Sequence, residues 1–235
     1  MLMRSERTIK AVIFDLDNTL VESQIDYLQM KSDVLEELVR EGVEPLLLDP
    51  SRTIVENVRV GKEDLSRKRP SVDLGAVDIR VNALLTAREL ERVETVRVHP
   101  GVSETLQAVR DRGMRMAVLT RGSRTYAMKV LSLTGLDGRV GPCVCRDDYP
   151  LEEAKPNPLA MRRAASKMGL SSEECLYIGD HPMDLECARA SGAIFVGVLT
   201  GSTDLEKWHQ SGCEAVIASV ADLPSFIATT LANDT

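Results

Sequence analysis

The sequence predicts an α/β fold in which a doubly wound, mainly parallel sheet carries a helical insert near its beginning. From residue 97 onward, short apolar runs alternate with longer segments of helical character. Short, continuously apolar runs are typical of strands covered on both faces, and their alternation with helices indicates right-handed βα crossovers. Residues 22–96 lack this alternation and show helical periodicity instead. We therefore expect one domain from residues 1–21 and 97–235, and a smaller α-helical domain from residues 22–96.

Apolar runs of four to six residues, with one shorter run, are the candidate strands. In chain order they are Ala11 to Phe14, Met116 to Leu119, Cys143 to Cys145, Cys175 to Ile178, Ile194 to Leu199 and Ala215 to Ala218. Between them, Val102, Leu106 and Val109 recur at helical spacing before Gly113, which predicts a helix over residues 102–112. Residues 171–174 read Ser-Ser-Glu-Glu, a pattern that favours a capped turn before a strand.

Two helical faces are expected in the insert. The first would bury Ile25, Leu28, Leu35, Leu38 and Val39. The second would bury residues at positions i, i+4, i+7 and i+8, which are Val77, Val81, Leu84 and Leu85. Between these faces, residues 44–70 contain three prolines and a dense charge cluster, which indicates a solvated loop and helix surface.

Composition and charge narrow the classes of partner and location. The net charge of -7 argues against a general attraction to nucleic acid or to an anionic membrane surface. The first residues lack the apolar region of a signal peptide, and no apolar segment is long enough to span a bilayer. The five cysteines form no regular framework and are expected to be reduced thiols. We therefore predict a cytoplasmic protein that binds neither nucleic acid nor membrane.

Two aspartates end the first candidate strand. Asp15 and Asp17 are separated by one residue, so in an extended chain both side chains project to the same side. Ligands of open α/β sheets bind beyond the carboxyl ends of the strands. Two carboxylates this close repel one another, so either one of them holds a proton or a cation neutralises them. A turn and helix cap is the simpler explanation of the Asn18-Thr19 pair that follows.

The next two strand ends carry groups suited to a phosphate. Thr120, Arg121 and Gly122 supply a hydroxyl, a guanidinium and backbone amides that are able to hold phosphate oxygens. The loop after the Cys143 strand leads to Lys155-Pro156-Asn157-Pro158, in which prolines fix the path of the chain around one lysine. Either cluster alone would be an ordinary helix cap or a surface charge.

A further strand end contributes two more carboxylates. Asp180 and Asp184 follow the Cys175 strand and are four residues apart, so they share a face if a helix begins there. Helix capping would explain either acid alone, but together the strand ends provide four carboxylates beside phosphate-binding groups. Magnesium suits this set because it prefers oxygen ligands and is often held by a few carboxylates together with a substrate phosphate.

In this ordered combination the chain resembles the phosphatase branch of the haloacid dehalogenase superfamily, and in particular phosphoglycolate phosphatases. The four motifs of that superfamily match Asp15 to Thr19 (DLDNT), Thr120, Lys155 within KPNP, and Gly179 to Asp184 (GDHPMD). The resemblance runs nearly end to end, and it implies a Rossmann-like core with a small helical cap domain inserted after the first motif. In this interpretation residues 22–96 are the cap.

The resemblance also implies roles for the motif residues. Asp15 would be the nucleophile that forms an aspartyl phosphate, and Asp17 the general acid and base, whose backbone carbonyl also binds Mg²⁺. Thr120 and Lys155 would bind the phosphoryl oxygens, with Arg121 and Gly122 in the same phosphate-binding loop. Asp180 would be a direct metal ligand and Asp184 a direct or water-mediated one. The expected activity is hydrolysis of a small phosphorylated metabolite, possibly 2-phosphoglycolate.

Other functions are compatible with parts of this pattern. A phosphosugar mutase of the same superfamily would keep Asp17, whereas a dehalogenase would lack an aspartate there. A catalytically silent phosphate-binding regulatory protein would keep the fold. A phospho-accepting receiver module is opposed by the layout, because the proposed nucleophile ends the first strand and a helical insert separates it from Thr120.

Overall fold

The structure is a computed structural model that describes residues 8–230. A six-stranded, all-parallel sheet lies at its centre, with the strand order β5-β4-β1-β6-β7-β8. The strands are β1 (Ala11–Phe14), β4 (Arg115–Leu119), β5 (Cys143–Val144), β6 (Cys175–Gly179), β7 (Ile194–Val198) and β8 (Val216–Ile217). The predicted α/β class is confirmed, and each predicted strand is present with ends shifted by at most two residues.

Helices cover both faces of this sheet, as its apolar runs predicted. One face packs against α4 (Val102–Asp111), α5 (Arg124–Leu133) and α9 (Leu223–Thr230). The other face packs against α6 (Pro158–Lys167), α7 (Pro182–Ser191) and α8 (Leu205–Gln210). Strand β1 contributes alternate residues to the two apolar clusters, and all of its side chains are buried. Because β1 is flanked by β4 and β6, its carboxyl end lies at the middle of the sheet edge.

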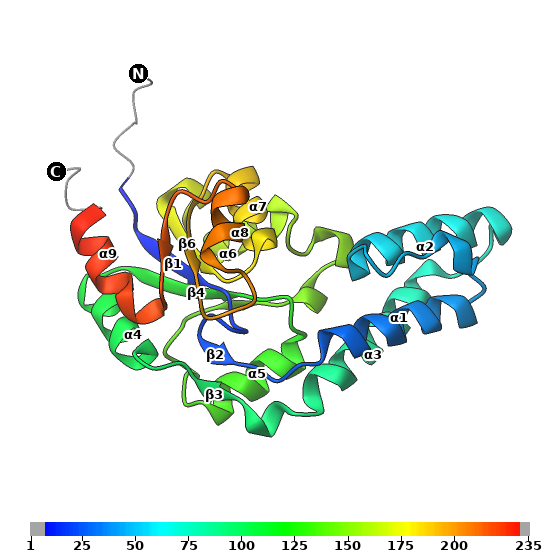
Figure 1. Cartoon of the computed structure of the whole chain (residues 1–235), viewed down its shortest axis with the longest axis horizontal. Coiled ribbons are helices and arrows are strands. Elements are labelled where there is room, and N and C mark those ends of the chain that lie inside the picture. Colours follow the sequence, from blue (N-terminus) through cyan, green and yellow to red (C-terminus); the bar gives the residue numbers. More distant parts are fainter. Residues whose placement is uncertain (1–7, 231–235) are drawn as a thin grey trace, which may run out of the picture.

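Residues 27–90 include three α-helices that share an apolar cluster of their own. They are α1 (Tyr27–Arg40), α2 (Ile54–Lys68) and α3 (Leu74–Leu90). Figure 1 shows them side by side, projecting away from the sheet at one end of the molecule. The face predicted for residues 77–85 is confirmed, since Val77, Val81 and Leu85 are buried.

The apolar face predicted for α1 is only partly right: Leu38 is buried as expected, but two other members of that face are exposed. Leu28 is 83% exposed and Val39 is 41% exposed. The buried residues are Met30, Val34 and Leu38, which follow one another at four-residue intervals. The helix begins only after its N-cap at Asp26, so Ile25 lies outside it, and the buried face is rotated from the one that the apolar residues suggested.

The charged segment before α3 is also more ordered than its composition suggested. Thr53 and Glu56 form a reciprocal capping box that starts α2 at Ile54. Gly61 lies on the buried side of this helix, where an added Cβ would come within 3.2 Å of the Leu38 side chain. The lack of a side chain at Gly61 therefore lets α2 pack closely against α1, while the charged residues of α2 mostly face solvent.

Two short strands were not predicted. β2 (Val21–Glu22) and β3 (Arg97–Val98) pair antiparallel, with Val21 opposite Val98. β2 lies where the chain leaves the sheet for the three helices, and β3 lies where it returns. The two connecting segments therefore run side by side. Among residues 8–230, no helix is long and apolar enough to cross a membrane.

Candidate active site

The site begins at the carboxyl end of β1. The Asp15 amide donates to the Ile178 carbonyl at 2.8 Å, which continues the pairing with β6 for one residue beyond the strand. The chain then turns back sharply, because the amides of Leu20 and Val21 both donate to the Leu16 carbonyl. Asn18 adopts φ = 57° in this turn. The turn leaves the Asp15 side chain buried below the sheet edge, with only 6% exposed.

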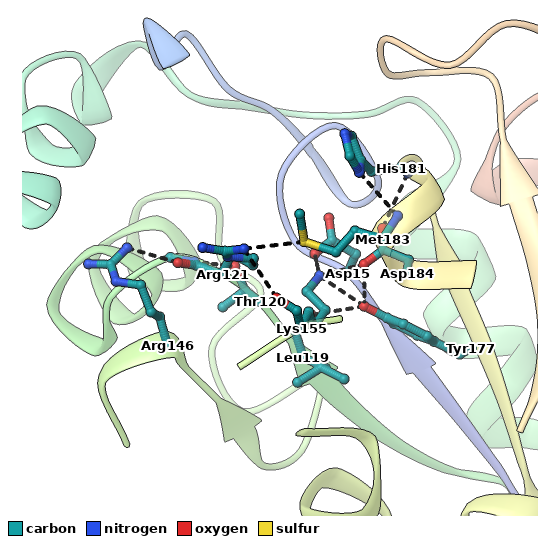
Figure 2. A network of polar contacts seen from close by, with 11 residues as sticks. Asp15, Leu119, Thr120, Arg121, Arg146, Lys155, Tyr177, His181, Met183 and Asp184 are labelled. Carbon is teal, nitrogen blue, oxygen red and sulfur yellow. Dashed lines mark hydrogen bonds and ion pairs between the residues drawn. The ribbon is translucent and has the colours of Figure 1, made fainter. Parts of the chain in front are cut away.

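Lys155 is the centre of the polar contacts at this edge. Its ammonium donates to Asp15 Oδ1 at 2.5 Å, to Asp184 Oδ1 at 2.7 Å and to the Tyr177 hydroxyl at 2.9 Å. Figure 2 shows Lys155 between these side chains, which come from the residue after β1, from β6 and from α7. The lysine is 3% exposed, and hydrogen bonds from an ammonium to carboxylates in such a setting are strong. The structure thus joins Lys155 to three residues that lie 140, 29 and 22 positions away in the sequence.

Asp15, Asp180 and Asp184 form a compact acidic cluster. One carboxylate oxygen from each lies within 4.8 Å of the others. Burial raises the pKa of Asp15 well above its usual range; Lys155 opposes this shift, and Asp184 and Asp180 add to it. Burial and the neighbouring Asp184 raise the pKa of Asp180 to about 7. Burial is the largest cause of both shifts, and the repulsion between the carboxylates adds to it.

The donor set of the cluster fits a hard divalent cation. It consists of buried carboxylate oxygens, the ligands that Mg²⁺ prefers, and a cation would offset the repulsion between these carboxylates. Backbone approaches this cluster closely. An added Cβ at Gly201 would lie 1.9 Å from Asp180 Oδ2, and one at Gly179 would lie 2.5 Å from Asp184 Oδ2. Only glycine fits at these two positions without moving a carboxylate.

Asp17 has surroundings different from those of Asp15. Its Oδ1 accepts a hydrogen bond of 2.5 Å from the hydroxyl of Tyr126, which lies on α5. Burial raises the pKa of Asp17 to about 6, although the bond from Tyr126 opposes the shift. A carboxyl group with such a pKa exchanges its proton near neutral pH, as acid and base catalysis requires.

The loop after β4 presents the second polar cluster. Thr120 is buried, and its Oγ1 accepts from the Gly122 amide at 2.9 Å, so its own hydroxyl proton points elsewhere. An added Cβ at Gly122 would lie 2.7 Å from the Tyr126 ring. Ser123 then caps α5, accepting from the Tyr126 amide. Arg121 donates from Nη1 to the Lys155 carbonyl at 3.1 Å and contacts Met183 Sδ at 3.5 Å.

A buried ion pair connects the helical insert with this loop. Arg146, after β5, pairs with Glu89 of α3, and their side chains are 2% and 3% exposed. Arg146 also donates to the Arg121 carbonyl at 2.8 Å and to Asn82 Oδ1 at 3.0 Å. The other Glu89 oxygen accepts from the Ser123 amide at 3.0 Å.

The structure therefore brings all the sequence-predicted site residues to one edge of the sheet: Asp15, Asp17, Thr120, Arg121, Gly122, Lys155, Asp180 and Asp184. Sequence reasoning missed Tyr126, Tyr177 and the Glu89–Arg146 pair. A hydroxyl inside the apolar run CLYI was the available signal for Tyr177. His181, near the site, acts as the N-cap of α7 through its Nδ1.

Comparisons with known proteins agree with this architecture. A family model described as haloacid dehalogenase-like hydrolase matches residues 9–192. The chain is 28% identical to a phosphoglycolate phosphatase of Nitrosospira multiformis, covering 93% of this chain and 96% of that protein. It is 30% identical to a phosphoglycolate phosphatase of Neisseria meningitidis, covering 92% and 91%. The fold matches the crystal structure of a hydrolase from Pseudomonas syringae with TM-score 0.67 and 24% identity, covering 94% and 99%.

These findings confirm the prediction of an enzyme of the haloacid dehalogenase phosphatase type. The matched residues include each of the motifs on which the prediction rested. The chain therefore belongs to the haloacid dehalogenase-like hydrolases.

Proposed function

We propose that the protein is a magnesium-dependent phosphomonoester hydrolase that acts on a small phosphorylated metabolite through an aspartyl phosphate on Asp15. The observation that carries the proposal is the contact of 2.5 Å between Asp15 Oδ1 and the Lys155 ammonium, beside two further buried aspartates. The names of the phosphatase relatives support 2-phosphoglycolate as the first substrate to test.

Asp15, Asp180 and Asp184 would hold the magnesium ion, together with the backbone carbonyl of Asp17. When bound, the ion would neutralise these carboxylates and withdraw negative charge from the phosphoryl oxygens. Thr120 and the amides of the loop that includes Arg121 and Gly122 would contact those oxygens from the other side.

In the first half-reaction, Asp15 attacks phosphorus in line while Lys155 holds its carboxylate in place. The bond between phosphorus and the ester oxygen breaks, and that oxygen takes a proton from Asp17. In the second half-reaction, Asp17 accepts a proton from a water molecule, which attacks phosphorus and restores the Asp15 carboxylate. Tyr126 keeps Asp17 oriented through both steps, since its hydroxyl bonds one carboxylate oxygen.

Residues 22–96 act as the cap in this proposal, and residues 1–21 and 97–235 as the catalytic core. The three insert helices have their own apolar cluster, and the paired strands β2 and β3 join them to the sheet. Such a cap excludes water from the phosphoryl group and selects the leaving group.

The direct test is the Asp15→Asn substitution, measured as phosphate release from an aryl phosphate and from 2-phosphoglycolate with and without Mg²⁺. A neutral amide is a poor nucleophile, so kcat should fall at least about a thousand-fold. Asp111→Asn, at an exposed position in α4, is the matched control and should keep full activity.

Wild-type turnover by Asp15→Asn would refute the covalent mechanism. Folded wild-type protein that releases no phosphate across a range of pH and Mg²⁺ concentration would refute the hydrolase assignment itself. A panel of phosphorylated metabolites ranked by kcat/KM tests the narrower substrate, and a preference for sugar phosphates over 2-phosphoglycolate would overturn it.

A further inference from the structure

The guanidinium of Arg121 lies between the Lys155 backbone and Met183, without a carboxylate partner among residues 8–230. Its Nη1 bonds the Lys155 carbonyl and touches Met183 Sδ, as Figure 2 shows. Within residues 8–230, no carboxylate oxygen lies at ion-pairing distance from this group. A carbonyl oxygen and a sulfur satisfy part of its hydrogen-bonding capacity but do not balance its charge.

Arg146, in the same region, has a carboxylate that pairs with its charge. It pairs with Glu89 and donates further bonds to Asn82 and to the Arg121 carbonyl. Arg121 has no such counterion, and burial together with the charge of Arg146 lowers its pKa to about 10. Burial is the larger cause, because it disfavours a charged group in surroundings of low polarity, and an anion bound to the guanidinium would stabilise that charge.

The loop that carries Arg121 is fixed in place. The Arg121 carbonyl accepts from Arg146 at 2.8 Å, and the Gly122 carbonyl accepts from the Arg146 amide at 3.1 Å. The Gly122 amide donates to Thr120, and the Ser123 amide donates to Glu89. A guanidinium on a backbone held in this way loses little freedom when it binds a ligand, which favours affinity.

One residue spans the distance from Arg121 to the reacting centre. The backbone carbonyl of Lys155 bonds Arg121, and the ammonium at the other end of the same residue bonds Asp15. A ligand with one end at Asp15 and the other at Arg121 therefore needs to be only about as long as a lysine side chain. A phosphomonoester with a short leaving group has this length.

We propose that Arg121 is a specificity residue that binds a carboxylate on the leaving group, so that the preferred substrates are short phosphorylated carboxylic acids. A guanidinium and a carboxylate form two parallel hydrogen bonds, which fix the orientation of the ligand as well as its charge. The inference rests on the proposed hydrolase function. In this inference Arg121 binds the leaving group of the substrate, whereas Thr120 and Lys155 bind the phosphoryl group that is transferred.

The test compares 2-phosphoglycolate with ethyl phosphate, which has a similar chain but no carboxylate. The quantity measured is the ratio of their kcat/KM values in the full-length protein with Mg²⁺. In Arg121→Met this ratio should fall about 10- to 100-fold, the effect expected for loss of a charged hydrogen-bonding partner. Arg121→Lys should restore part of it. Arg112→Met is the control, since Arg112 likewise bonds backbone carbonyls but lies at the end of α4, and it should leave the ratio unchanged.

If Arg121→Met left the ratio of the two kcat/KM values unchanged, the inference would be overturned. This includes the case in which activity on both substrates falls equally, because Arg121 would then act on the phosphoryl group or on the loop. Binding of both compounds to Asp15→Asn, measured by calorimetry with and without Arg121→Met, gives a readout independent of turnover. Loss of the preference for 2-phosphoglycolate in the double variant supports the inference even if the wild-type protein hydrolyses neither compound; an Arg121-independent preference overturns it.

Discussion

Removing Arg146 tests whether the buried pair with Glu89 ties the helical insert to the sheet. The substitution Arg146→Met keeps an unbranched apolar chain of similar length but removes the guanidinium. Among residues 8–230, it leaves the Glu89 carboxylate, 3% exposed, with only the Ser123 amide as a partner. It also removes the donors to Asn82 and to the Arg121 carbonyl.

The expected loss of unfolding free energy is large because the remaining charge, on Glu89, is buried. Removing one member of a buried ion pair costs about 3–5 kcal/mol of unfolding free energy. For a chain of this size, each kcal/mol shifts Tm by roughly 2–4 °C, so we expect a decrease of roughly 6–20 °C. Adding Glu89→Gln to Arg146→Met should recover at least about 1 kcal/mol, because the amide removes the unpaired charge and still accepts from Ser123.

Urea and thermal unfolding, followed by circular dichroism, would measure these changes. Arg59→Met is the matched control, since Arg59 pairs with Glu63 across an exposed turn of α2, where both side chains are more than half exposed. That variant should unfold at nearly the same temperature as the wild-type protein. If Arg146→Met were as stable as Arg59→Met, the buried pair would not hold the insert and the reasoning would fail.

Two further predictions concern the acidic cluster. Gly201→Ala should raise the Mg²⁺ concentration needed for half-maximal activity about tenfold or more. The new Cβ would lie 1.9 Å from Asp180 Oδ2 and displace that carboxylate. Equal Mg²⁺ titration curves for the wild-type protein and the variant would contradict this prediction. Mg²⁺ at about 100 times its Kd should stabilise the wild-type protein by about 2.7 kcal/mol. Asp180→Asn should lose most of this gain in a thermal shift assay without substrate, and an undiminished shift would exclude Asp180 from the metal site.

The sheet was predictable because the sequence of a buried parallel strand is locally distinctive. The run from Ala11 to Phe14 is apolar at every position since helices cover both of its faces, and it is bounded by a lysine and an aspartate. The short pair of Val21 and Val98 has no such signal. These residues stand on either side of a long insert, and they pair only because the fold brings the two connecting segments together.

Site residues that belong to a local sequence motif could be predicted. Contacts between residues from distant elements were harder to predict. Asp15 and Lys155 each stand in a recognisable local pattern, and their contact follows from the meeting of strand ends. Nothing in the residues around Glu89 indicated that it would pair with Arg146, 57 positions later. The exposed Leu28 illustrates the same limit, since an apolar side chain identifies a helix face only when the register of the helix is known.

The ammonium of Lys155 has a consequence for the order of events in the site. It carries three protons, and in this structure they are directed to Asp15, Asp184 and Tyr177. A phosphate oxygen that approaches Lys155 must therefore take the place of an existing partner. The Tyr177 hydroxyl is the cheapest to release, because it is neutral and also bonds Asp184 at 2.8 Å. We therefore expect the Tyr177 hydroxyl to be the partner that a substrate phosphate displaces from Lys155, while the lysine keeps its hydrogen bond to Asp15.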